Sequence, residues 1–191
     1  MTAIDKAALD PTQAFDVKRV RADFPILDLK VNAPAGVYDV VGLTNWRSAA
    51  ANRTLNFAEK LGLDAGREYL VFDFWKQELL GSFKDSLQVD VGPHDTRVLA
   101  VHPRLDHPQL VGNSRHISGA QSIAELGWDT AAKRLKGTSE TIAGEPYTLY
   151  VHVPPGYKLA TAKGVVGSKP GLVTLMFQGQ NEPIRWELQF E

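Results

Sequence analysis

Imidazole and hydroxyl side chains carry most proton and acyl transfer in proteins, so they are the first residues of this sequence to test for chemistry. None of the histidines stands in the i, i+4 pair that a helical metal site uses. A nucleophile elbow needs Gly-x-Ser-x-Gly at a strand-to-helix turn, and that motif is missing. The chain also contains no cysteine. We therefore predict no catalytic residue and no metal site. The five histidines are His94, His102, His107, His116 and His152.

Two carboxylates stand out because they lie beside aromatic side chains. Asp73 falls within the run Phe72–Trp75, and Glu78 follows it closely. A carboxylate buried in such a run needs a backbone or arginine partner, which favours a structural hydrogen-bonding role over catalysis. A small hydrolase with an acid pair at Asp73 and Glu78 remains an alternative.

Three aromatic residues are candidates for contact with carbohydrate, because sugar rings stack on exposed aromatic faces. Trp128 precedes an aspartate, Tyr157 follows a Pro-Pro-Gly turn, and Trp46 precedes an arginine. These residues point to an oligosaccharide as partner and to a stand-alone carbohydrate-binding module as one function. Packing in a core or an interface is the other interpretation of the same rings.

The charge balance argues against two large classes of partner. Lys and Arg number 21 and Asp and Glu 22, a formal net charge of −1. Such a chain has no field that attracts phosphate backbones or anionic lipid, so we expect no nucleic-acid and no membrane partner. The glycine-containing stretch Gly164–Gly167 lacks the Lys-Ser/Thr pair of a phosphate loop, and we expect no cofactor. No signal peptide is recognisable, and the compartment stays open.

Alternation of apolar and polar residues dominates the chain and is typical of half-buried strands. It is faultless in Ile184–Phe190 and clear in Leu87–Val91 and Tyr147–Val153. Four denser apolar runs predict strands covered on both faces. These runs are Tyr38–Leu43, Tyr69–Trp75, Val98–Val101 and Leu172–Phe177.

Frequent Gly and Pro turns between these runs predict an all-β fold, an antiparallel Greek-key β-sandwich. Residues 1–27 read as a short helical or irregular lead-in, and residues 28–191 as the sandwich. A division into two sub-lobes near residues 105–120 is kept open. In Ser48–Leu61 an alanine-rich start favours helix and the later alternation favours strand, and we expect a strand.

Several runs in the first two thirds of the chain, taken in order, resemble one family. Tyr38–Trp46, Leu61–Leu63 and Tyr69–Trp75 with Leu80-Gly81 behind it are similar to the C-terminal β-sandwich of α-galactosidase (melibiase)-type glycoside hydrolases. The order continues with Val91–His94, Arg97–Val101 and Ser114–Gly119. The resemblance covers roughly residues 24 to 128.

The resemblance implies a non-catalytic accessory domain. In that family two aspartates of a (β/α)₈ barrel, N-terminal to the sandwich, do the chemistry. Such a barrel takes about 250 residues, more than this chain of 191 contains. No catalytic residue carries over. The implied partner is an N-terminal catalytic barrel of the same polypeptide, with residues 1–27 as the connection to it.

Overall fold

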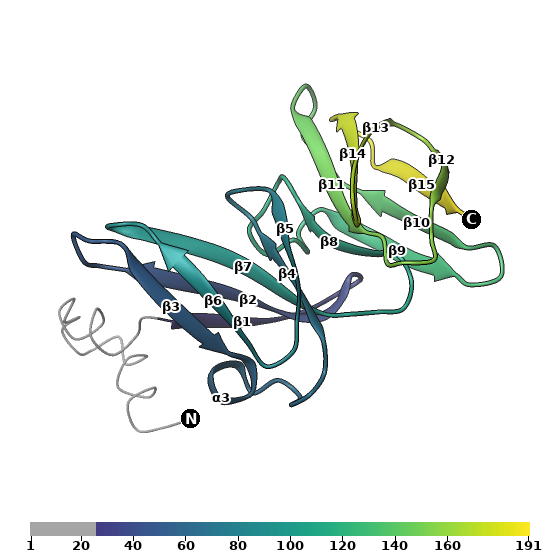
Figure 1. The fold of residues 1–191 in the computed structure, drawn as a ribbon. Coiled ribbons are helices and arrows are strands. Elements are labelled where there is room, and N and C mark those ends of the chain that lie inside the picture. Colours follow the sequence, from purple (N-terminus) through teal and green to yellow (C-terminus); the bar gives the residue numbers. More distant parts are fainter. Residues whose placement is uncertain (1–25) are drawn as a thin grey trace.

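The computed structural model describes residues 26–191, and these form an almost purely β structure (Figure 1). The helical lead-in predicted for the N-terminus lies outside the described residues. Strand β1 (Ile26–Ala33) begins at Ile26, so the last two residues assigned to the lead-in belong to a strand. Within residues 26–191 no helix is long and apolar enough to cross a membrane.

A five-stranded sheet and a two-stranded sheet face each other in the first half of the chain and form the first sandwich (Figure 1). The larger sheet has the order β1-β2-β7-β4-β5, the smaller pairs β3 with β6, and all neighbours are antiparallel. The strands after β1 are β2 (Gly36–Asn45), β3 (Ala51–Asn56), β4 (Tyr69–Asp73), β5 (Glu78–Phe83), β6 (Ser86–Val91) and β7 (Asp95–Pro103).

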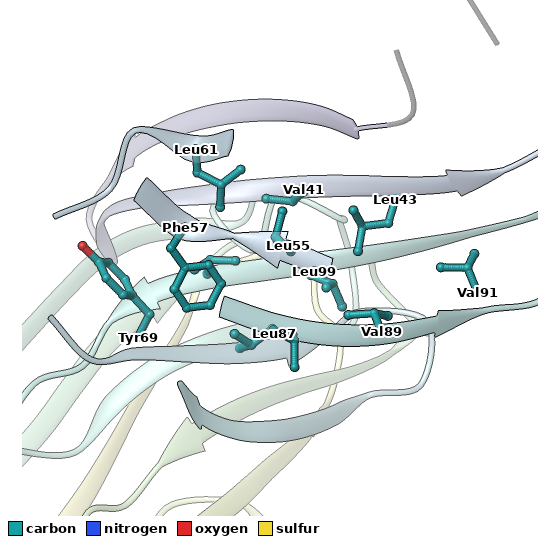
Figure 2. Packing of buried hydrophobic residues seen from close by; sticks show 12 residues of the cluster. Val41, Leu43, Leu55, Phe57, Leu61, Tyr69, Leu87, Val89, Val91 and Leu99 are labelled. Carbon is teal, nitrogen blue, oxygen red and sulfur yellow. The ribbon is translucent and has the colours of Figure 1, made fainter. Parts of the chain in front are cut away.

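The core of the first sandwich lies between these two sheets. Figure 2 shows how it brings Leu55, Leu87 and Val89 of the small sheet against Val41 and Leu99 of the large one. Because side chains alternate across a strand, this layer takes every second residue of β2 and β7. Helix α3 (Phe57–Leu61) closes one end of the core with its two buried residues.

Two antiparallel sheets of four strands form the second sandwich, with orders β12-β15-β10-β9 and β13-β14-β11-β8. A core with Trp186 and Leu149 at its centre lies between them. The strands are β8 (Gln109–Asn113), β9 (Ile123–Asp129), β10 (Arg134–Ser139), β11 (Pro146–His152), β12 (Leu159–Ala162), β13 (Val165–Lys169), β14 (Leu172–Gln178) and β15 (Ile184–Phe190).

The second sandwich packs on the outer face of the five-stranded sheet. Phe72 of β4 meets Tyr150 of β11 at 4.8 Å between ring centroids. Leu70 belongs to the same buried cluster, as do Val111 and Leu172 from the second sandwich. We call this contact the seam. The five-stranded sheet is therefore covered on both faces in its middle, which explains the dense apolar runs of β2, β4 and β7.

The prediction of an antiparallel all-β sandwich is confirmed, and strands that neighbour each other in the sheets are often out of chain order. The expectation for Leu172–Phe177 holds only at the start of β14, where Leu172 joins the seam and Val173 the core of the second sandwich. Further along the strand it was wrong, because Met176 on the same face as Leu172 is exposed.

Ser48–Leu61 divides between strand and helix, with β3 at Ala51–Asn56 and α3 after it. The side chain of Asn56 accepts the Glu59 amide hydrogen at 2.9 Å and so starts the helix. Gly62 ends it with a φ of 66°, in the left-handed region.

Candidate functional site

Asp73, at the end of β4, is fully buried and forms an ion pair with Arg97 of β7. Its other oxygen accepts the Lys76 amide hydrogen at 2.9 Å. Arg97 also donates to the Asp90 carbonyl at 3.1 Å. Glu78 is opposite Asp73 in the β-ladder, but its side chain is exposed. The carboxylate has the arginine partner that the sequence predicts, and the geometry is that of a structural pair.

Two histidines are buried at the seam. His102 of β7 stacks on Tyr38 with centroids 3.9 Å apart, and its Nε2 donates to the Val111 carbonyl at 3.1 Å. Burial lowers the pKa of His102 to about 4. Burial, with a smaller contribution from the charge of Arg104, lowers the pKa of His152 to about 4 as well. Both rings are neutral at ordinary pH.

A serine and a histidine also meet in the loop after β8, in a pairing that the sequence analysis missed. Nδ1 of His116 accepts the Ser118 amide hydrogen at 3.1 Å and therefore also accepts from Ser118 Oγ, 2.9 Å away. That oxygen receives the amide hydrogen of Ala120 at 3.3 Å. Among the described residues no carboxylate bonds the histidine. The geometry is that of a loop cap rather than a nucleophile with its base.

Two of the three candidate sugar-contact residues come together at one end of the second sandwich. Trp128 and Tyr157 meet edge to face at 5.6 Å, and each contacts the buried Phe190. His107 lies parallel to Trp128, with centroids 4.9 Å apart and an interplanar angle of 1°. Trp128 thus contacts rings on several sides, whereas Tyr157 lines a pocket that Trp128 does not line.

Trp46 lies elsewhere, just after β2 in the first sandwich, and is 41% exposed. Sugar contact at Trp46, Trp128 and Tyr157 stays a prediction. Trp75 was not among the predicted contact residues, yet it is 65% exposed in the turn between β4 and β5, where it packs edge to face on Phe74 at 4.9 Å. Its place in an apolar run suggested a buried strand, and the turn that follows Asp73 is what exposes it.

The family described as "Alpha galactosidase C-terminal beta sandwich domain" matches residues 32–101. The match begins near the end of β1 and ends within β7, so it lies within the first sandwich. The resemblance seen in the sequence is confirmed over this range.

Two solved structures are similar to the chain. Alpha-galactosidase I from Mortierella vinacea shares 27% identity over 41% of this chain and 21% of its own, with a TM-score of 0.36. Arthrobacter globiformis T6 isomalto-dextranse complexed with panose shares 17% identity over 85% of this chain and 33% of its own, with a TM-score of 0.33. The chain thus spans a third or less of either protein. No curated protein sequence matches it.

The described residues hold no group of three or more His, Cys, Asp or Glu side chains arranged for a metal ion. Two further surfaces have functional potential: the exposed apolar residues of the first sandwich and the pocket beside Tyr157.

Proposed function

We propose that this chain is a non-catalytic accessory domain of an α-galactosidase-like glycoside hydrolase, and that it packs against the catalytic barrel of the same polypeptide. The match of residues 32–101 to a domain that is C-terminal in α-galactosidases carries the proposal. We further propose that the two sandwiches are two sub-lobes that divide in the link between β7 and β8, within residues 104–108.

The outer face of the five-stranded sheet offers a surface for such a barrel. Gly42 of β2 lies between Leu27 of β1 and Val98 of β7 in the sheet. The Val98 carbonyl in turn accepts the Phe74 amide hydrogen at 2.9 Å. These residues therefore form one row across β1, β2, β7 and the end of β4. Since Gly42 has no side chain, Leu27 lies over it.

Part of this face remains exposed beside the second sandwich. Leu27 is 58% exposed and Leu29, two residues on and on the same face, is 56% exposed. Phe74 and the exposed Trp75 continue the surface at the other end of the row. We call Leu27, Leu29, Phe74 and Trp75 the apolar rim. Exposed apolar side chains that gather on one face are typical of an interaction surface.

The rim also lies where a preceding domain approaches. β1 is the edge strand of the sheet and the first described element, so the polypeptide enters the sandwich alongside Leu27. A barrel that precedes this chain in the natural polypeptide would be joined to the sandwich at this edge.

The first test is the mass of the natural gene product, measured by immunoblot of source cells with an antibody against this chain. We expect a band far above the 21.0 kDa of the chain. The purified chain should show no turnover of an aryl α-galactoside. A band at 21.0 kDa, or turnover by the chain alone, overturns the proposal.

The second test uses Leu29→Asp in both the isolated chain and the natural polypeptide. In the isolated chain an exposed substitution should change the free energy of unfolding by less than about 0.5 kcal/mol. In the natural polypeptide it places a charge in the interface, so hydrolase activity should be lost at a lower temperature. The control is Val37→Asp, because Val37 is 62% exposed but lies on the opposite face, with Val41. Equal behaviour of the two variants in the natural polypeptide rejects this interface.

A further inference from the structure

The second sandwich carries a pocket that the α-galactosidase match does not reach. The pocket has a volume of about 690 Å³ and lies between two segments, residues 152–159 and residues 168–173. The first segment joins β11 to β12, and the second is the turn between β13 and β14. A pocket of this size is large enough for a small ligand such as a short saccharide.

An aromatic ring held from behind forms one wall of the pocket. Tyr157 lines it and meets Trp128 at 5.6 Å and Phe190 at 6.4 Å, with interplanar angles of 80° and 90°. His107 stacks on Trp128 from the far end of the cluster. These contacts restrict the Tyr157 ring before any ligand arrives, which lowers the entropic cost of binding. Trp128 thus acts as a support and Tyr157 as the ring available to a ligand.

The charged side chains around this ring are two lysines. Lys158, Ser168 and Lys169 line the pocket and are exposed, and neither lysine has an ion-pair partner within residues 26–191. Among the residues that the structure describes, no aspartate or glutamate lines it. Glu191 lies beside Lys158, joined to it by two backbone hydrogen bonds, but it does not line the pocket. Two lysines in the lining, with no acid there, favour a ligand that carries a negative charge.

His152 lines the same pocket, and its Nδ1 is buried without a hydrogen-bond partner. Within residues 26–191 only Arg53 and Arg134 have another such nitrogen. A buried polar atom left unpaired lowers stability, so it requires a reason in a native structure. A binding site at this end of the sandwich supplies one.

We propose that this pocket binds an acidic saccharide, with a sugar ring stacked on Tyr157 and a carboxylate paired with Lys158 and Lys169. A sugar ring matches the flat aromatic face, and a carboxylate matches the two free ammonium groups. The site belongs to the second sandwich and does not depend on the proposed accessory role of the first.

The test is calorimetric titration of the purified 191-residue chain with a trimer of galacturonic acid and with the neutral trimer of galactose. The acidic trimer should bind at least about tenfold more tightly, because a hydrogen bond to a charged group contributes that much. Its affinity should fall as salt is added. Lys169→Gln should weaken it about tenfold. Lys136→Gln is the matched control, because Lys136 is an exposed and unpaired lysine of the same sandwich outside this pocket.

Tyr157→Ala should abolish binding of the acidic trimer, with the fold checked by circular dichroism. If that variant does not fold, the lysine variants decide, since both side chains are exposed. Equal binding of the two trimers, an equal effect of Lys169→Gln and Lys136→Gln, or no binding at all overturns the proposal. None of these readouts involves hydrolysis or the natural mass of the protein, so this site and the accessory role fail independently.

Discussion

Replacing Asp73 by asparagine should destabilise the chain strongly while leaving its shape intact. The carboxylate is fully buried, and Arg97 is only 8% exposed. Asparagine keeps the size of the side chain and an acceptor for the Lys76 amide hydrogen, but it leaves the guanidinium as an unpaired buried charge. Removing one partner of a buried ion pair costs about 3–5 kcal/mol.

The assay is urea denaturation followed by tryptophan fluorescence, with the free energy of unfolding extrapolated to water. Glu68→Gln is the matched control in the same sandwich, because the Glu68–Arg104 pair has side chains 51% and 31% exposed. An exposed pair contributes less than about 1 kcal/mol. The double variant Asp73→Leu with Arg97→Met should recover much of the loss, since two apolar side chains replace the pair without leaving a charge.

A cost for Asp73→Asn as small as that for Glu68→Gln would refute this reasoning. It would mean that water reaches the pair or that Arg97 finds another partner. Loss of an α-galactosidase-like activity with unchanged stability would instead revive the acid-pair alternative at Asp73 and Glu78.

Two further predictions concern the seam. His102 has a pKa of about 4 against an ordinary value of 6.5. The unfolded chain therefore binds a proton more readily than the folded one, so the free energy of unfolding is highest above pH 6.5 and falls as the pH drops toward 4. The loss in the free energy of unfolding between pH 7 and pH 4 is about 3 kcal/mol. His102→Gln should flatten that part of the stability profile measured by urea denaturation, and an unchanged profile would contradict the assignment. Gly112→Ala places a Cβ 2.7 Å from a ring carbon of Phe72 and should cost about 1–3 kcal/mol in the same assay. Gly127→Ala has no atom within 4 Å and should be neutral, so equal effects of the two alanines would argue against close packing at the seam.

The fold was predictable because the residue patterns are local. The perfect alternation of Ile184–Phe190 appears as β15, and the dense run at Tyr69 appears as a strand buried on both faces. The run at Leu172 was misjudged because burial of the second face depends on which sheet lies opposite, and a single segment does not encode that. Asn56 and Gly62, a cap and a stop, were the available signals for helix α3.

The candidate site was less predictable than the fold. Trp128 and Tyr157 were named from residue type alone, and their contact with Phe190 and His107 joins four separate segments of the chain. Nothing in the sequence near Trp128 specifies that a histidine ring from the β7–β8 link lies parallel to it. The pocket likewise depends on two segments that only the sheet order brings together.

The sharing of one sheet by two packing layers has a consequence for synthesis on the ribosome. When β7 has emerged, the first sandwich has all its strands, yet Leu70, Phe72 and Ala100 still lack their partners from the later half. Those partners include Tyr150 and Leu172, which are made dozens of residues later. The nascent chain therefore exposes an apolar face during that interval. Exposed apolar surface of this kind binds chaperones and promotes aggregation. A gene fragment that stops after β7 keeps this face exposed permanently.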